Sequence, residues 1–335
     1  MKVLVETFGC RANQYDSERV KAMVTAGGGE IVTSADGADI AVYNSCAVTA
    51  EAEADLRQKV RRGARSNPRI RSVIMGCASG LELARPASPG VRSLADLPSV
   101  ERMIPGADLA AVASAIGVSA GTGAYAQTGA RGLLRIQDGC NEHCTFCATT
   151  IARGVNRSRP AEEIVEEAEK LADAHSEIVI TGIHIGSYGT DIESSLSALV
   201  AKLIVRVPSV RFRLSSLEAT EVDDRLIELY RSERERLAPY LHAPLQSGSD
   251  RILKRMGRSW YTSASYAFAV ERVIDGHEFF GLGADVIAGF PGETDADHLE
   301  TVRLLEPLPF TSLHVFPYSP RPGTAAPRMS GAVQQ

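Results

Sequence analysis

The strongest constraint on the fold is an alternation of strand-like and helix-like segments between residues 134 and 318. A strand that is followed by a helix and a second strand pairs in parallel, so an alternation of this length predicts a full or partial parallel barrel. The predicted strands cover 134–137, 177–182, 210–216, 240–248, 281–292 and 312–318, and the predicted helices cover 161–174, 194–206, 222–232, 263–275 and 296–306.

The N-terminal part of the chain alternates in the same way and predicts a separate α/β domain with a parallel sheet. Its predicted strands cover 2–5, 30–33, 38–43 and 72–75, and its predicted helices cover 16–26, 50–65, 97–103 and 109–116. Residues 119–132 are rich in Gly, Ala and Thr and are interpreted as a linker. We therefore expect one domain over 1–125 and the barrel domain over 130–335.

The composition agrees with two globular domains, because 335 residues exceed one ordinary core. The chain has no apolar run long enough to span a membrane, and its N-terminus lacks the features of a signal peptide. These observations predict a cytoplasmic protein. The net charge of −5 argues against nucleic-acid binding over the whole surface, but it leaves room for a local basic face.

Three of the six cysteines, Cys10, Cys46 and Cys77, each follow the end of a predicted N-terminal strand. Because the carboxyl ends of parallel strands lie at one edge of a sheet, these thiols are expected to converge there. The alternative is that they are ordinary core residues, since free cysteine is often buried. For a single cysteine of this kind the core interpretation is favoured, whereas three cysteines at equivalent positions favour a shared functional site.

The other three cysteines, Cys140, Cys144 and Cys147, form a C-x3-C-x2-C loop just after the first predicted barrel strand. Three thiolates suit a 4Fe–4S cluster with one iron left for an external ligand. Zinc is the alternative, with His143 as a possible fourth ligand, but no second C-x2-C or H-x3-H completes a tetrahedron. Disulfides are disfavoured in a cytosolic chain, and a nucleophilic cysteine is the weakest interpretation.

The C-x3-C-x2-C loop, with Phe146 before its third cysteine, resembles the signature of the radical S-adenosylmethionine (SAM) enzymes. The resemblance implies that SAM binds the open iron of the cluster and that its reductive cleavage gives a 5′-deoxyadenosyl radical. Cys140, Cys144 and Cys147 would then be the catalytic cluster ligands.

The rest of the chain resembles the methylthiotransferase branch of these enzymes. The motifs that carry this resemblance are TFGCRANQYDSE, NSCAVT, MGC, TGIHIGSYG, SSLE, HAPLQSGSDRILKRM, ADVIAGFPGET and FPYSPRPGT. The resemblance implies that Cys10, Cys46 and Cys77 hold a second, auxiliary 4Fe–4S cluster. Among the substrate branches, the one that acts on threonylcarbamoyladenosine in tRNA fits best. Branches that act on isopentenyladenosine in tRNA or on a ribosomal-protein aspartate stay open.

The implied reaction is methylthiolation of C2 of N6-threonylcarbamoyladenosine next to the anticodon of tRNA. The resemblance implies a flavodoxin- or ferredoxin-type electron donor, sulfur held at the auxiliary cluster, and a second SAM as the methyl source. The sequence does not identify the sulfur donor or the oligomeric state. An alternative of another class is a non-catalytic RNA-binding protein that carries an iron–sulfur cluster or zinc.

Two sets of residues are expected to contact ligands. The resemblance suggests SAM contacts at Thr181, Gly182, Ser216, Glu218 and Gln246, although these residues could instead serve turns, barrel packing or the surface. Clustered basic residues predict contacts with RNA phosphates or bases, although solvated arginines are the common alternative. These residues are Arg57, Lys59, Arg61, Arg62, Arg65, Arg153, Arg157 and Arg159.

The chain departs from the family pattern at three places. Ala148, Thr149 and Thr150 stand where the family usually has Ile-Pro, and Ala219 follows Glu218 where proline is usual. Both changes are expected to alter loop rigidity near the SAM pocket without removing a ligand. The family usually continues into a small all-β RNA-binding (TRAM) domain, which is expected to be absent from this chain.

Overall fold

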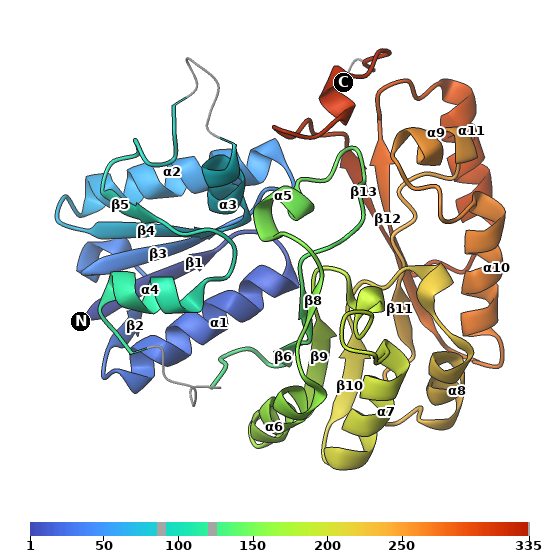
Figure 1. Ribbon diagram of the computed structural model, residues 1–335, viewed down its shortest axis with the longest axis horizontal. Coiled ribbons are helices and arrows are strands. Elements are labelled where there is room, and N and C mark those ends of the chain that lie inside the picture. Colours follow the sequence, from blue (N-terminus) through green and yellow to red (C-terminus); the bar gives the residue numbers. More distant parts are fainter. Residues whose placement is uncertain (86–91, 120–125, 334–335) are drawn as a thin grey trace. The chain divides into compact units, whose positions relative to one another are not determined.

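The computed structural model describes residues 1–85, 92–119 and 126–333 (Figure 1). The chain forms two compact units. Unit 1 contains residues 1–129, 148–155 and 321–323, and unit 2 contains residues 130–147, 156–320 and 324–335. Part of the predicted linker, 120–125, lies outside the described residues. No helix in the described part of the chain is both long and apolar enough to cross a membrane.

Unit 1 is built on a five-stranded parallel sheet with the order β2-β1-β3-β4-β5. Its strands are β1 (Lys2–Thr7), β2 (Glu30–Val32), β3 (Ile40–Ser45), β4 (Arg71–Gly76) and β5 (Val100–Met103). Its helices are α1 (Arg11–Ala26), α2 (Ala50–Ser66), α3 (Cys77–Ala84), α4 (Leu109–Ile116) and α5 (Thr149–Arg153), with a 3-10 turn η1 (Ala35–Gly37).

Alternate residues of the strands pack against helices on opposite faces of this sheet. Val42 lies in the apolar cluster with α1 and α4, whereas Tyr43 lies in the cluster with α2. Figure 1 shows α1 and α4 on one side of the sheet and α2 on the other. In a doubly wound sheet of this strand order, ligands bind where the order reverses, which is between β1 and β3.

One predicted helix of unit 1 is wrong. Residues 97–103 do not form a helix, since residues 97–99 lie in a turn and Val100–Met103 is strand β5. Ser99 has a φ of 68°, which lies outside the helical region of backbone conformation. The parallel pairing of β5 with β4 satisfies the backbone groups that a helix would otherwise satisfy. The predicted helix over 109–116 is confirmed as α4.

Unit 2 contains six parallel strands in two three-stranded sheets, β10-β9-β6 and β11-β12-β13. Isolated parallel bridges, including one between Ser216 and His242, join β10 to β11, so the strands form a partial barrel. The strands are β6 (Gly132–Arg135), β9 (Glu177–Thr181), β10 (Arg211–Leu214), β11 (Tyr240–His242), β12 (Gly281–Ala288) and β13 (Ser312–Pro317). A short antiparallel pair, β7 (Gln137–Asp138) and β8 (Arg157–Ser158), stands beside them.

Helices cover the outer side of the strands (Figure 1). They are α6 (Ala161–Ala172), α7 (Leu196–Arg206), α8 (Asp224–Ser232), α9 (Asp250–Arg255), α10 (Ser263–Ile274) and α11 (Asp295–Leu305), with 3-10 turns η2 (Ile185–Ser187), η3 (Ala219–Glu221) and η4 (Ala326–Arg328). These elements confirm the predicted fold class, an N-terminal parallel-sheet α/β domain followed by a partial (β/α) barrel.

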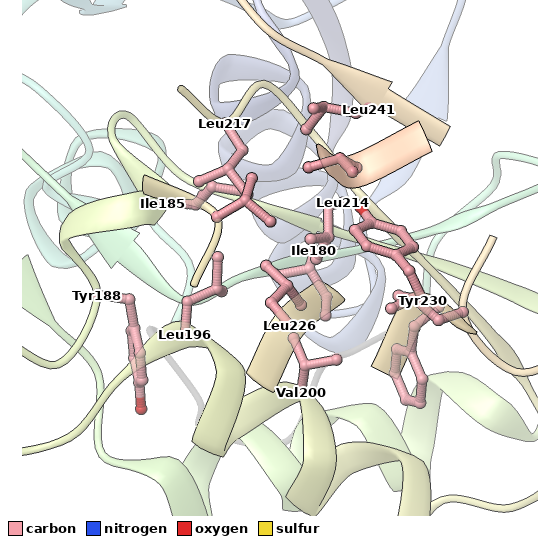
Figure 2. Close-up of a cluster of buried hydrophobic side chains, with 14 of the residues drawn as sticks. Ile180, Ile185, Tyr188, Leu196, Val200, Leu214, Leu217, Leu226, Tyr230 and Leu241 are labelled. Atoms are coloured by element: carbon pink, nitrogen blue, oxygen red, sulfur yellow. The ribbon is translucent and has the colours of Figure 1, made fainter. Parts of the chain in front are cut away.

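The core of unit 2 lies between the strands and these helices (Figure 2). Ile180 of β9 and Leu214 of β10 are fully buried there, together with Val200 of α7 and Tyr230 of α8. Side chains alternate along a strand, so the residues next to Ile180 and Leu214 in their strands, such as Arg213, point to the inner side of the barrel. The inner side is therefore available for polar groups.

Candidate functional sites

The three N-terminal cysteines converge at the carboxyl edge of the unit 1 sheet. Cys10 follows β1 and precedes α1, Cys46 follows β3, and Cys77 opens α3 directly after β4. Asn13 connects two of them, because its Oδ1 lies 3.9 Å from the Cys10 sulfur and 3.8 Å from the Cys77 sulfur. The backbone N–H of Val48 donates to the Cys46 sulfur at 3.4 Å. The predicted convergence therefore occurs in the structure.

Glycine allows the backbone to pass close to these sulfurs. Gly9 has a φ of 101°, and a methyl group there would come within 2.7 Å of the Cys46 sulfur. Gly76, which precedes Cys77, has a φ of 95° and lacks room for a side chain. Both positions need a residue without Cβ, because left-handed backbone and close contacts exclude other residues.

Arg153 is buried among the N-terminal cysteines. Its Nε donates to the Cys77 sulfur at 3.1 Å, and one terminal nitrogen donates to Asn13 at 2.8 Å and to Asp16 at 3.0 Å. The side chains of Arg153 and Asp16 are both 0% exposed. This burial corrects the prediction that Arg153 binds RNA. Burial raises the pKa of the Cys77 thiol to about 12, against the opposing effect of Arg153.

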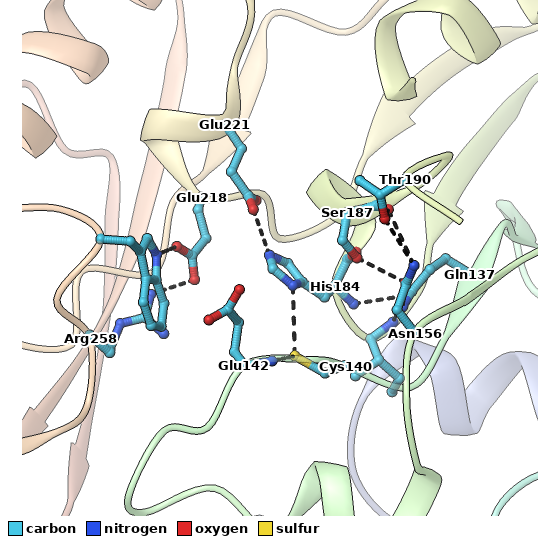
Figure 3. Close-up of polar contacts among 12 residues, drawn as sticks. Gln137, Cys140, Glu142, Asn156, His184, Ser187, Thr190, Glu218, Glu221 and Arg258 are labelled. Atoms are coloured by element: carbon cyan, nitrogen blue, oxygen red, sulfur yellow. Dashed lines mark hydrogen bonds and ion pairs between the residues drawn. The ribbon is translucent and has the colours of Figure 1, made fainter. Parts of the chain in front are cut away.

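In unit 2, Gln137 fixes the base of the C-x3-C-x2-C loop (Figure 3). The residue is fully buried on β7. Its side-chain oxygen accepts from the backbone N–H groups of Ile183 and His184 at 3.0 and 2.9 Å. Its nitrogen donates to the Gly139 carbonyl at 2.5 Å and to Asn156 at 2.6 Å. Gln137 thereby joins the start of the cysteine loop to the segment that follows β9.

His184 lies between Cys140 and Glu221 (Figure 3). Its Nδ1 is 3.7 Å from the Cys140 sulfur, and its Nε2 is 2.8 Å from a Glu221 carboxylate oxygen. Burial alone lowers the pKa of His184, but the interactions with Cys140 and Glu221 outweigh burial and raise it to about 10. The two partners of the His184 ring therefore favour its cationic form beside the first cysteine of the loop.

A second cationic group, Arg258, stands beside Cys144. It donates to the Cys144 sulfur at 3.5 Å and to the carboxylate of Glu218, which also accepts from Trp260 Nε1 at 2.7 Å. Burial raises the pKa of the Cys144 thiol to about 12, and Arg258 opposes this shift. The Glu218 side chain is only 12% exposed, so the alternative of an ordinary surface carboxylate is wrong.

The other four predicted SAM contacts lie at or just beyond the carboxyl ends of barrel strands. Thr181 ends β9 and is buried, and Gly182 follows it against the Gln137 side chain. Ser216 is exposed after β10, and Gln246 adopts a φ of 66° after β11. The cysteine loop also follows the carboxyl end of a strand, so all of these residues belong to one end of the barrel. Their contact with SAM stays a prediction.

The predicted RNA-binding residues fall into two groups. On α2, Lys59, Arg62 and Arg65 are exposed, and Arg61 is half-buried. Arg157 is also exposed, with Asp138 at 3.8 Å. Arg57 instead pairs with Glu53 at 2.9 Å, and Arg159 pairs with the buried Glu167 at 2.8 Å. Both side chains are partly exposed, so their contact with RNA stays a prediction.

One group of side chains in the described part of the chain is spaced so that it could hold a metal ion. The donor atoms of His242, Asp285 and His314 all lie within 4.8 Å of one another. His143, the residue considered as a zinc ligand beside the loop cysteines, is exposed on the loop. Zinc at the loop cysteines stays an alternative interpretation.

Sequence reasoning missed several polar residues of these sites. His184 and Arg258 stand beside cysteines of the C-x3-C-x2-C loop, and Gln137 organises that loop, yet none of the three was selected from the sequence. His242 and His314 also flank Asp285 on β11, β12 and β13, at 2.9 and 3.1 Å from one carboxylate oxygen. The family motifs contain His184 and His242, so membership in a motif was the available signal, but the motifs do not name their partners.

Comparisons with known proteins agree with the two units. Residues 2–86 match the model of "Uncharacterized protein family UPF0004", and residues 134–305 match the Radical SAM superfamily. The threonylcarbamoyladenosine tRNA methylthiotransferase MtaB of Thermotoga maritima is 36% identical over 99% of this chain and 78% of its own length. The MtaB of Bacillus subtilis is also 36% identical, over 99% of this chain and 77% of its own. The chain belongs to the radical SAM methylthiotransferases.

Other relatives of this methylthiotransferase support the family and the fold. A tRNA-2-methylthio-N(6)-dimethylallyladenosine synthase of Erythrobacter litoralis is 33% identical over 98% of the chain and 77% of its own length. The radical SAM methyltransferase TsrM of Kitasatospora setae, solved with cobalamin and a 4Fe–4S cluster, has a TM-score of 0.67 at 13% identity. It covers 97% of the methylthiotransferase and 73% of its own chain, and shows a shared fold alone.

Proposed function

We propose that this methylthiotransferase adds a methylthio group to C2 of N6-threonylcarbamoyladenosine next to the anticodon of tRNA. The observation that carries the proposal is the 36% identity over 99% of the chain to a relative named for threonylcarbamoyladenosine in tRNA. Relatives from Bacillus subtilis and Aquifex aeolicus bear the same name at 36% and 35% identity. The dimethylallyladenosine relative, at 33%, marks the second candidate substrate.

The chain offers ligands for two 4Fe–4S clusters. Cys140, Cys144 and Cys147 would hold the cluster that binds SAM, and the triplet Cys10, Cys46 and Cys77 would hold the auxiliary cluster. When bound, the first cluster and SAM would supply a carbon radical able to take hydrogen from an unactivated C–H bond. A flavodoxin- or ferredoxin-type protein is proposed as the electron donor.

The side chains around the loop have separate tasks in this proposal. His184 and Arg258 place positive charge beside Cys140 and Cys144, which favours the thiolate form that binds iron. Gln137 holds the loop against the segment after β9, where Thr181 and Gly182 would contact SAM. Glu218 is fixed by Arg258 and Trp260, so its carboxylate would orient a bound ligand without rearranging.

Exposed basic side chains are proposed to meet the tRNA. Lys59, Arg62 and Arg65 lie on α2, which follows the Cys46 segment, and the exposed Arg157 follows the loop region. Basic side chains contribute salt-dependent binding to phosphates, and the base itself is reached most easily in a single-stranded loop. RNA binding by these side chains is therefore expected to weaken with added salt.

The test is expression of this chain in a bacterial strain whose own methylthiotransferases for both modified adenosines have been deleted. Mass analysis of tRNA nucleosides is expected to show 2-methylthio-N6-threonylcarbamoyladenosine, and Cys144→Ala, which removes one proposed ligand, is expected to abolish it. Appearance of the methylthio group on dimethylallyladenosine alone would assign the second candidate. Unchanged tRNA together with a methylthiolated ribosomal protein would move the substrate to protein.

A further inference from the structure

Unit 1 is not one continuous segment of the chain. Residues 148–155 and 321–323 return to it from the downstream sequence. Each return brings a buried arginine, since Arg153 is 4% exposed and Arg321 is 3% exposed. Arginine is rarely buried this deeply without a charged partner, so both side chains need an explanation.

The guanidinium of Arg153 is held from two sides. One terminal nitrogen donates to Asn13 and Asp16, and Nε donates to the Cys77 sulfur at 3.1 Å. Asp16 and Asn13 both lie on α1, the helix that starts after Cys10. The donor that reaches the sulfur is therefore fixed in direction by groups that belong to the same site.

Asn13 ties this arrangement to the backbone around the other cysteines. Its amide nitrogen donates to the carbonyls of Phe8 and Ser45, at 3.0 and 2.7 Å, and its oxygen accepts from Arg153. These carbonyls lie in the segments that carry Cys10 and Cys46. One asparagine thus couples the position of the Arg153 guanidinium to all three cysteine segments.

Arg321 provides a second positive charge on the same site. Its terminal nitrogen lies 3.0 Å from Glu53 of α2, and its charge acts favourably on the Cys46 thiolate. Arginine stays protonated under all relevant conditions, so neither charge can be lost by titration. Three neighbouring thiolates repel one another, and fixed positive charges reduce that repulsion.

We propose that Arg153 is a positioning residue of the Cys10, Cys46 and Cys77 site that sets the reduction potential of the cluster held there. The inference rests on the proposed auxiliary cluster. Net charge and hydrogen bonds to sulfur tune the potentials of iron–sulfur clusters. A positive charge that donates to a ligand sulfur favours the more negative, reduced cluster, and so raises the potential. The positive charge of Arg321 acts in the same direction.

One consequence concerns assembly. Residues 1–129 contain the three cysteines, but the two arginines come from the segment after Cys147 and from the end of the barrel sequence. The electrostatic environment of the N-terminal site is therefore complete only in the full chain. The segment that matches the first family model, residues 2–86, contains the three thiols but neither Arg153 nor Arg321.

The test uses the full chain with Cys140, Cys144 and Cys147 all replaced by alanine, so that any cluster resides on the N-terminal triplet. Anaerobic reconstitution of this parent is expected to give about four irons per chain. Iron close to zero would remove the auxiliary cluster from the proposed function and would leave nothing for Arg153 to tune. That outcome is distinguishable from a failure of the inference, which requires a cluster that is present.

The decisive variant is Arg153→Gln combined with Asp16→Asn, which removes both charges of the buried pair together. A single change would leave an uncompensated buried charge and could unfold the unit. The midpoint potential, from electron paramagnetic resonance during a redox titration, is expected to shift to a more negative value. The matched control replaces an exposed pair of the same unit, Arg71→Gln with Glu101→Gln, whose ion-pair distance is 2.8 Å.

The inference is overturned if the parent, the buried-pair variant and the exposed-pair control hold equal iron and share one midpoint potential. If the buried-pair variant keeps its far-ultraviolet circular dichroism but loses iron, Arg153→Lys decides the case. Recovery of iron binding by lysine supports the role of the positive charge at this position. Equal loss of iron in the lysine variant contradicts that role.

Discussion

The structure makes a strong prediction for Gln137→Leu, a change of similar size at a fully buried position. Four buried or partly buried backbone groups would lose this partner: the N–H groups of Ile183 and His184 and the carbonyls of Asp138 and Gly139. The Asn156 side-chain oxygen would keep the Ser187 hydroxyl as a donor. Leucine offers neither a donor nor an acceptor. The loop that carries Cys140 would therefore lose its connection to the segment after β9.

The expected magnitude follows from these four groups. Leaving one buried donor or acceptor unsatisfied costs about 1–3 kcal/mol, so four at the lower end cost about 4 kcal/mol. Extra burial of the apolar leucine returns about 1 kcal/mol. The remaining loss of about 3 kcal/mol corresponds to a change of roughly 100-fold in a local opening equilibrium. The effect should be local, because all four groups lie near the loop.

Hydrogen exchange measured by mass spectrometry of the cluster-free protein checks this expectation. Peptides over residues 137–147 and 180–190 should exchange roughly 100-fold faster in Gln137→Leu, while peptides over residues 1–85 of unit 1 keep their rates. Tyr266→Phe is the control, because it removes one buried hydroxyl that donates to the Ala243 carbonyl at 2.7 Å. If Gln137→Leu accelerates exchange no more than this control does, Gln137 does not organise the loop.

Three further predictions follow from local geometry. Gly182→Ala puts a methyl group 2.9 Å from the Gln137 side-chain oxygen and should displace the segment that is proposed to contact SAM. The affinity for SAM, measured by equilibrium dialysis, should therefore fall by at least about tenfold. An unchanged affinity would show that this segment does not contact SAM. Gly76→Ala would put a methyl group within 2.4 Å of its nearest neighbour, whereas the methyl group of Gly28→Ala would meet nothing within 4 Å. At Gly28 the positive φ alone should cost about 1–3 kcal/mol of strain. Urea unfolding should therefore show a much larger loss of unfolding free energy for Gly76→Ala than for Gly28→Ala. A hydrogen bond from Arg251 holds the pKa of Asp297 below its usual range. The stability that this carboxylate adds should therefore be present above about pH 4 and be lost as the pH falls further. Asp297→Asn should flatten this acid dependence of the thermal unfolding temperature, and an unchanged pH profile would contradict the prediction.

The elements of the fold were predictable where one local pattern dominates. The helix over 109–116 has apolar and small residues throughout, and it matches α4. The strands before Cys10, Cys46 and Cys77 are short, mainly apolar runs, so their carboxyl ends and the cysteines beyond them could be placed. Strand length was less predictable: 240–248 contains only three residues of β11, because the chain after His242 bends into a loop.

The helix predicted over 97–103 failed because of a long-range partner. Val100–Met103 contains no strong local preference, and its pairing with β4 decides its conformation. Propensity is a weak prior that tertiary contacts override, most easily in short segments at the edge of a sheet.

The arginines show what the sequence could not reveal. Clustered positive charge predicts a surface for phosphates, and this reasoning assigned Arg153 and Arg157 the same role. In the structure one is buried and the other is exposed, although only four positions separate them. What distinguishes them is Asp16, a carboxylate 137 residues earlier, which faces Arg153 in the core of unit 1. No local pattern contains that partner.

The same reasoning explains why ligands were predictable and their supporting residues were not. A thiol binds iron by its own chemistry, so its type and spacing announce its role. Arg258 and Arg153 are proposed to act through a cysteine. Their residue type alone does not indicate this role, which depends on a sulfur within hydrogen-bond distance. Arg258 meets Cys144 across 114 positions of the chain, and Arg153 meets Cys77 across 76. The proposed roles of Arg153 and Arg258 therefore depend on contacts between residues far apart in the sequence, which no local motif contains.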